Sequence, residues 1–217
     1  MIHLLWPTIR PNVFLSTLQD WLTKATNSSQ IKVVPIVNNQ EQADACGYNA
    51  IVTNPSEQGV AKALYTATKN YEAEDGDILI VASDDFFPPQ DWDKIVLEEF
   101  ASFDGLLVFF DGIQCSSTLV TIPMLTFSAL KKMNRIIYHP SYKHLWSDVE
   151  CFRNAAELGI LKDLRREKRH IIFEHRHYST GKRSSDHVDV YANQFERADC
   201  ENFNRRMQRP LVERLKE

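Results

Sequence analysis

Short apolar runs alternate along the chain with longer segments in which apolar residues recur every three or four positions. Uninterrupted apolar runs are typical of strands buried on both faces, whereas the longer spacing is typical of helices that cover a sheet. The apolar runs predict strands at 2–6, 31–37, 51–52, 78–82, 105–111, 118–124 and 170–173. The helical spacing predicts helices at 12–25, 57–71, 91–100, 127–133, 146–158 and from about 189 to 217.

The order of these elements predicts the fold class. Strands and helices alternate through the first half, which favours an α/β fold with a mostly parallel sheet flanked by crossover helices. The second half is less regular and ends in a helical C-terminal tail. Since the 217 residues contain no internal repeat and no long linker, we expect a single domain over 1–217.

Composition and charge exclude several classes of protein. A hydrophobic fraction of 43% is enough for a proper core, and a net charge of −4 argues against a broadly basic nucleic-acid binder. The four cysteines form no C-x-x-C pair, so we expect reduced thiols in a cytoplasmic protein rather than a zinc site or a disulfide framework. No signal peptide and no transmembrane segment are expected, because no apolar run approaches about 18 residues.

Two adjacent carboxylates, Asp84 and Asp85, directly follow the predicted buried strand at 78–82. Ligands of open α/β sheets bind outside the carboxyl ends of the strands. Paired carboxylates repel each other unless a cation or protons neutralise them, and oxygen ligands suit Mg²⁺ or Mn²⁺. The pair therefore predicts a metal site, and the alternative interpretation is an ordinary acidic turn.

Other polar residues also stand at or near the ends of predicted strands. They are Arg10, Asn38, Asn39, Asp111, His175 and His177. If the strands are parallel, several of these side chains meet the acid pair at one edge of the sheet. Carboxylates, an imidazole and an arginine at such an edge suit a metal-bound diphosphate, because a guanidinium pairs bidentately with phosphate oxygens.

Four short segments, in order over nearly the whole chain, carry a set of motifs. They are 7–11 (PTIRP), 83–85 (SDD), 146–150 (WSDVE) and 173–177 (FEHRH, followed by Gly181 and Lys182). The set resembles a small, stand-alone glycosyltransferase of the GT-A fold, in the family-2-like group. The resemblance implies a Rossmann-like fold with a nucleotide-binding half at about 1–112 and an acceptor-side half with the tail at about 113–217. One departure is Ser83, which stands where the family's D-x-D motif has its first acid.

The resemblance also implies a role for individual residues. It implies a Mn²⁺ or Mg²⁺ ion held by Asp85 and by His177 or His175, and nucleotide-donor contacts from Thr8, Arg10, Asn38, Asn39, Asp84 and Lys182. Asp148 would be the general base that accepts the proton of the acceptor hydroxyl, and Glu150 competes for this role. Against these roles stand ordinary alternatives, since aspartate at a helix start is a common N-cap and histidines are often surface residues.

The implied function is a metal-dependent transfer of a sugar from a nucleotide-sugar donor, UDP-linked in the first instance, to a hydroxyl acceptor. The acceptor is left open between a glycan, a protein and a modified nucleic acid, such as a modified DNA base. Two other classes of function share the strand-end acids. One is a metal-dependent nucleotidyltransferase or phosphohydrolase, and the other is a non-catalytic nucleotide-sugar binder.

Overall fold

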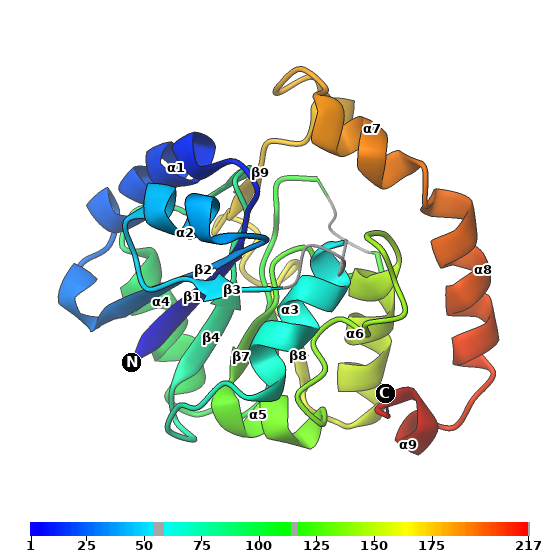
Figure 1. Ribbon diagram of the computed structural model, residues 1–217. Coiled ribbons are helices and arrows are strands. Elements are labelled where there is room, and N and C mark those ends of the chain that lie inside the picture. The colour runs from blue at the N-terminus through cyan, green and yellow to red at the C-terminus, as the bar shows by residue number, and fades with distance from the viewer. Residues whose placement is uncertain (54–58, 114–116, 217) are drawn as a thin grey trace.

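The computed structural model describes residues 1–53, 59–113 and 117–216, and a mixed sheet forms its centre (Figure 1). Within these residues the sheet has seven strands in the order β3-β2-β1-β4-β7-β6-β8. In that order the strands are Ile51–Val52, Ile31–Val37, Ile2–Pro7, Ile78–Val81, Met124–Thr126, Leu106–Val108 and Leu161–Asp163. Only β7 runs antiparallel to its neighbours, so the prediction of a mostly parallel sheet is confirmed.

The pairing of β1 with β2 and β4 decides which loops share an edge of the sheet. Ile2 of β1 lies opposite Ile31 of β2 and Ile78 of β4, and both pairings are parallel. The three strands therefore point the same way, and the loops that follow them meet at the carboxyl edge. This is the edge at which open α/β sheets bind ligands.

Helices cover both faces of the sheet and give the molecule three layers (Figure 1). Helices α1 (Pro11–Thr23), α2 (Gln40–Cys46) and α4 (Trp92–Phe100) cover one face, and α3 (Val60–Lys69), α5 (Phe127–Lys132) and α6 (Ser147–Glu157) cover the other. Because side chains alternate along a strand, Leu4 and Trp6 of β1 pack against the first layer, whereas Leu5 packs against the second.

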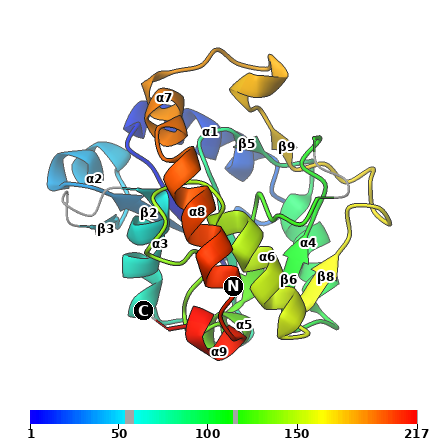
Figure 2. The ribbon, with the colours of Figure 1, turned by 90° about the vertical axis from the view of Figure 1, so that its right-hand side faces the viewer.

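The C-terminal segment confirms the predicted helical tail. It consists of α7 (His187–Asn193), α8 (Glu196–Met207) and α9 (Leu211–Arg214). Figure 1 shows α7 above the sheet, and Figure 2 shows α8 running in front of α6. The tail therefore connects the carboxyl edge of the sheet with the outer surface of α6.

A separate two-stranded ribbon joins the acid pair to a distant part of the chain. Strand β5 (Phe86–Phe87) follows Asp85 directly and pairs antiparallel with β9 (Glu174–His175). Phe86 lies opposite His175 in this ribbon, and their ring centroids are 4.4 Å apart. The ribbon therefore carries the late histidine segment to the end of β4.

Two predicted strands are wrong. The strand expected at 118–124 begins only at Met124, because the apolar residues before it pack into the core from an irregular segment; Val120 is fully buried without strand pairing. The strand expected at 170–173 is displaced to β9, and Ile172 makes only an isolated bridge to Phe110. An apolar run in the sequence indicates that its residues are buried, but a buried segment need not pair with a strand of the sheet.

Several described elements were not predicted, among them α2, β5 and β8. They are too short to show a clear period in the sequence. The first residues of the helix predicted at 57–71 lie outside the described residues, as does Cys115, and α3 begins at Val60. Among the described residues, no helix combines the length and the apolar character needed to cross a membrane.

Candidate active site

A pocket of about 720 Å³ opens at the carboxyl edge of the sheet. Four of the predicted donor-binding residues line it, namely Thr8, Arg10, Asn38 and Asp84. The start of α3 and the loop before α6 form one wall, and residues of α7 line the pocket as well. The volume lies within the range of small-molecule and cofactor sites.

Asp84 fixes the loop that follows β1. Its carboxylate accepts hydrogen bonds from Trp6 Nε1 at 2.9 Å, Thr8 Oγ1 at 3.0 Å and Arg10 Nε at 3.1 Å. Burial raises the pKa of Asp84, although these three donors oppose the shift. Because the carboxylate is buried and already occupied, Asp84 shapes the pocket mainly by holding Thr8 and Arg10 in place.

Asp85 has a different set of partners and faces the histidine segment. Its carboxylate accepts a hydrogen bond from Ser83 Oγ at 2.8 Å and lies 3.4 Å from His175 Nε2 and 3.5 Å from Arg183 Nη2. Burial alone would raise the pKa of Asp85, but the contacts with His175, Ser83 and Arg183 outweigh burial and hold that pKa below its usual range. Asp85 is therefore an ionised carboxylate beside an imidazole and a guanidinium.

His177 lies beside His175, with their ring centroids 5.0 Å apart. Its Nδ1 is 2.7 Å from Ser179 Oγ at the start of a short 3-10 turn (Tyr178–Thr180). Burial, followed by the charge of His175, lowers the pKa of His177, which favours the neutral imidazole that binds metal ions. His177 thus stands next to His175, which is in contact with Asp85.

The residues present fit a divalent cation that is completed by its substrate. Asp85 and His175 offer one carboxylate and one imidazole within contact distance of each other, and such mixed oxygen and nitrogen ligands suit Mn²⁺. In the described part of the chain there is no preformed group of three or more His, Cys, Asp or Glu residues able to hold a metal. Phosphate oxygens of a donor would therefore supply the remaining ligands.

Two predicted donor-binding residues have other partners and do not line the pocket. Asn39 caps α2, where its Oδ1 accepts a hydrogen bond from Gln42 N at 2.9 Å. Lys182 Nζ lies 2.9 Å from Glu174 Oε1, on the exposed side of the ribbon. The structure supports the turn and surface interpretations of these two residues.

Two ion pairs attach α7 to the edge of the pocket. The Arg10 guanidinium pairs with Asp186, and Arg183 pairs bidentately with Asp189 at 2.6 Å for both bonds. Asp186 and Asp189 form a reciprocal capping box at the start of α7. Their spacing three residues apart before an apolar helical pattern is the signal by which sequence reasoning could have found this segment.

Asp148 lies in the first turn of α6, and this helix begins directly after a residue with a left-handed backbone. Trp146 has φ 66°, which turns the chain sharply into the helix. Burial raises the pKa of Asp148 to about 6, although the hydrogen bond from Val149 N at 2.9 Å and the charge of His175 oppose the shift. A partly accessible carboxylate with a pKa near neutrality is suited to accept a proton.

Glu150 lies two residues further along and has a structural role. Its carboxylate accepts hydrogen bonds from Tyr142 Oη at 2.6 Å and from Arg206 at 2.9 and 2.7 Å. Burial alone would raise the pKa of Glu150, but the contacts with Arg206 and Tyr142 outweigh burial and lower it. The carboxylate is fully buried and ties α6 to α8, which argues against the competing prediction of Glu150 as the base.

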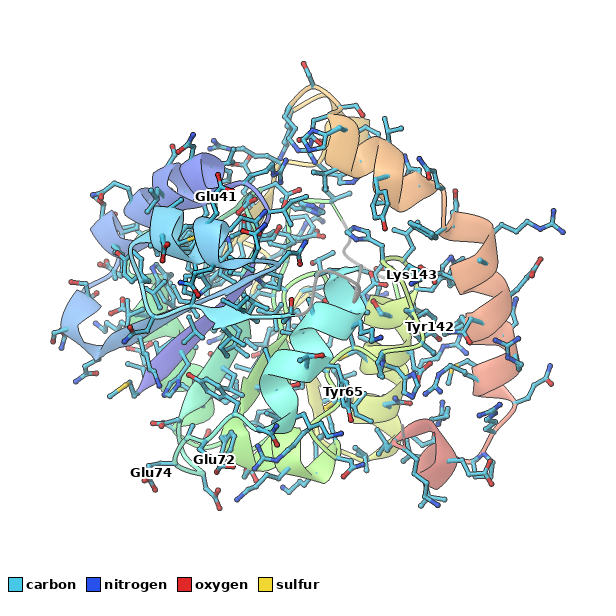
Figure 3. All side chains as sticks on the ribbon, viewed as in Figure 1. Glu41, Tyr65, Glu72, Glu74, Tyr142 and Lys143 are labelled. Atoms are coloured by element: carbon cyan, nitrogen blue, oxygen red, sulfur yellow. The ribbon has the colours of Figure 1, made fainter. Side chains whose placement is uncertain are left out.

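The loop before α6 is held by Asp199 of α8, a residue that no pattern in the sequence singles out. The buried Asp199 carboxylate accepts hydrogen bonds from Lys143 N at 3.0 Å and from His144 N and Leu145 N, both at 2.9 Å. Figure 3 shows Tyr142 and Lys143 on the side of the molecule that faces α8. Asp199 thereby fixes His144 in the wall of the pocket.

Comparison with known proteins identifies the fold. No protein-family model matches the chain, and no curated protein matches its sequence. Among solved structures, S. aureus TarS matches 75% of this chain with 35% of its own length, at a TM-score of 0.56 and 13% identity. The mannosyltransferase PcManGT from Pyrobaculum calidifontis, solved with GDP-Man and Mn²⁺, matches 75% of this chain with 53% of its own length, at a TM-score of 0.55 and 11% identity.

A shorter TarS structure, residues 1–349 with UDP, matches at a TM-score of 0.55 and 14% identity over 75% of this chain and 57% of its own. The chain therefore spans between about a third and somewhat more than half of the length of these three structures. At these identities the likeness defines the fold alone. The chain has the GT-A fold, as its resemblance to that family implied.

Proposed function

We propose that this protein is a metal-dependent glycosyltransferase that moves a sugar from a nucleotide-sugar donor to a hydroxyl acceptor. One observation carries the proposal. The carboxyl edge of a GT-A sheet combines an ionised carboxylate in contact with an imidazole, Asp85 and His175, with a second carboxylate, Asp148, whose pKa is raised to about 6. The first pair suits a cation, and the separate acid suits a proton.

The donor would lie in the pocket lined by Thr8, Arg10 and Asn38. Arginine pairs bidentately with phosphate oxygens, and Arg10 and Arg183 stand on either side of the acid pair Asp84 and Asp85. Both arginines now pair with acids of α7, so a diphosphate would exchange those carboxylates for its own oxygens. The choice of UDP as first donor is supported by TarS, which was solved with UDP and with UDP-GlcNAc.

The residues that would hold the cation are Asp85 and His175, with His177 as the neighbouring candidate. When bound, Mn²⁺ or Mg²⁺ offsets the negative charge that develops on the leaving diphosphate. The presence of Mn²⁺ in the structure of the mannosyltransferase supports this assignment. Arg183 would leave Asp85 free for the cation by pairing with phosphate oxygens instead.

Asp148 would be the general base. The acceptor hydroxyl loses its proton to an Asp148 oxygen while its own oxygen forms a bond to the anomeric carbon, and the bond from that carbon to the diphosphate breaks. With a pKa of about 6, Asp148 is mostly ionised at pH 7 and remains basic enough to bind a proton. One base serves a single displacement with inversion, and the acceptor is a hydroxyl of a glycan, a protein or a modified nucleic acid.

Thermal unfolding with nucleoside diphosphates and nucleotide sugars, each with Mn²⁺ or with EDTA, tests donor and metal together. A ligand at 100 times its Kd adds about 2.7 kcal/mol of stability. Stabilisation that needs both Mn²⁺ and one nucleotide supports the proposal and identifies the donor. Slow release of the nucleoside diphosphate from that nucleotide sugar, lost in Asp148→Asn, separates a transferase from a nucleotide-sugar binder. Equal stabilisation with EDTA would contradict the metal assignment.

A further inference from the structure

A second pocket lies far from the proposed active site, between α6, α8 and α9. It has a volume of about 440 Å³, and Arg153, Glu157, Met207, Arg209 and Arg214 are among the residues that line it. Asp148 stands at the start of α6 and Glu157 at its end, which separates them by roughly 14 Å along the helix axis. The second pocket is therefore not a continuation of the pocket at the carboxyl edge.

The buried residue in this pocket is Arg214, which is 4% exposed. Its Nη2 pairs with Glu157, its Nη1 lies 3.5 Å from Met207 Sδ, and its backbone oxygen accepts a hydrogen bond from Arg206 at 2.6 Å. The Nε of Arg214 is buried and has no hydrogen-bond partner in the described part of the chain. A guanidinium held at both Nη atoms, with an unused Nε–H donor, is prepared for an acceptor from outside the chain.

The remaining charges of the pocket favour an anion. Arg153 and Arg209 stand exposed among the lining residues, and Arg153 also stacks over the Phe203 ring at 5.2 Å. Three arginines against the single carboxylate of Glu157 leave a net charge of about +2 among the lining residues. Arginine forks recognise the oxygens of phosphate groups with charge-assisted hydrogen bonds.

We propose that this pocket binds a phosphate group, either free phosphate or a phosphate monoester, with Arg214 as the buried donor and Arg153 and Arg209 as the exposed ones. The inference does not rest on the proposed glycosyltransferase activity, because no residue of the proposed active site takes part in it. The pocket would give the protein a second anionic ligand, bound at the outer end of the helix that carries Asp148.

Phosphate-dependent thermal unfolding of the full chain, at constant ionic strength, tests this proposal. Inorganic phosphate should stabilise the protein, and Arg153→Gln or Arg209→Gln should weaken its apparent affinity by about tenfold each, as expected for one lost charge-assisted contact. Arg197→Gln is the matched control, because Arg197 is an exposed arginine of α8 that does not line the pocket. Methyl phosphate in place of inorganic phosphate tells a phosphate monoester from the free ion.

A second variant keeps the result unambiguous. Arg183→Gln removes an arginine of the proposed donor site and reports whether the stabilising phosphate is bound there instead. Phosphate affinity that is the same in Arg153→Gln, Arg209→Gln and Arg197→Gln would overturn the proposal. Loss of phosphate binding in Arg183→Gln alone would also overturn it, because the anion would then occupy the pocket below α7. Neither result would bear on donor binding with Mn²⁺, which the nucleotide experiment measures separately.

Discussion

The turn after β4 and the first turn of α6 each carry two acids close together, and in each region only one acid remains available for chemistry. At the turn, Asp84 is occupied by Trp6, Thr8 and Arg10. At the helix, Glu150 is occupied by Tyr142 and Arg206. In both regions the occupied acid fixes the surrounding segments through its hydrogen bonds. Its neighbour, Asp85 or Asp148, remains available.

The two available acids differ in their surroundings. Asp85 lies against His175 and Arg183, and these contacts lower its pKa. Asp148 has no ion pair in the described part of the chain, and burial raises its pKa to about 6. A carboxylate that stays ionised serves as a ligand for a cation, whereas one that titrates near neutrality serves as a proton acceptor. The surroundings of the two carboxylates therefore suit Asp85 to a cation and Asp148 to a proton.

Removing the proposed proton acceptor, Asp148, should change the catalytic rate more than any other substitution proposed here. Asp148→Asn should lower kcat by about 10²- to 10⁴-fold, because the amide cannot accept the proton of the acceptor hydroxyl. Donor affinity, measured by calorimetry with Mn²⁺, should stay within about twofold of the parent protein. In the parent protein, kcat/KM should fall about tenfold per pH unit below pH 6, where Asp148 becomes protonated. Near-normal turnover in Asp148→Asn would move the base role to another residue.

The second prediction concerns Asp85, the acid that is assigned to the cation. Asp85→Asn should weaken Mn²⁺-dependent donor binding by about 100-fold, since the amide removes the negative charge that faces the cation. Calorimetry with the nucleotide in Mn²⁺ and in EDTA measures this loss. Ser83→Ala is the control, because it removes only a neutral hydrogen bond to the same carboxylate and should change affinity by less than about tenfold. Donor affinity that is equal in Asp85→Asn and Ser83→Ala would remove Asp85 from the metal site.

How far the sequence predicts this arrangement depends on the distance along the chain between partners. The strand before Asp84 and Asp85 and the helix that begins near Asp148 follow from local patterns, so both acid pairs were found. Which acid of each pair is occupied was not predictable, because Arg10 lies 74 residues from Asp84 and Arg206 lies 56 residues from Glu150. No local pattern reports such contacts.

Contacts between distant parts of the chain also explain which features were missed or misplaced in the prediction from sequence. Asp199 contacts backbone N–H groups 54 to 56 residues away, and only the packing of α8 reveals it. The segment at 118–123 has the apolar character of a strand, yet the carbonyl group of Leu119, like that of Ser117 before it, accepts a hydrogen bond from the Arg165 side chain. Apolar periodicity predicted the sheet core well, and side-chain contacts between distant segments decided the rest.

A third effect concerns the occupied acid of α6. Glu150→Gln should lower the free energy of unfolding at pH 7 by about 3–5 kcal/mol, because it leaves Arg206 buried without its anionic partner. Urea denaturation measures the loss. The lowered pKa of Glu150 places this stabilisation above its unfolded pKa of 4.5, so the difference between variant and parent should shrink as the pH falls below that value. Glu201→Gln, at an exposed ion pair of α8, should cost less than about 1 kcal/mol.

The smallest effect is a gain in the free energy of unfolding, and it comes from substituting Asp148. The pKa of Asp148 is about 6 in the folded chain and 3.8 in the reference state, so folding favours its protonated form. This contribution to stability is complete below pH 3.8 and is lost as the pH rises through 6. Asp148→Asn removes the buried charge and should stabilise the protein at pH 8 by at most about 3 kcal/mol, less about 0.3–1 kcal/mol for a charge lost at a helix N-terminus. Near pH 3.5 the two proteins should be equally stable.

A variant that is less stable than the parent at pH 8 would mean that the Asp148 carboxylate has a stabilising partner, and the contrast with Asp85 would fail. A variant that is inactive and yet more stable would show that this acid is kept at α6 for chemistry, whereas Glu150 is kept for the fold.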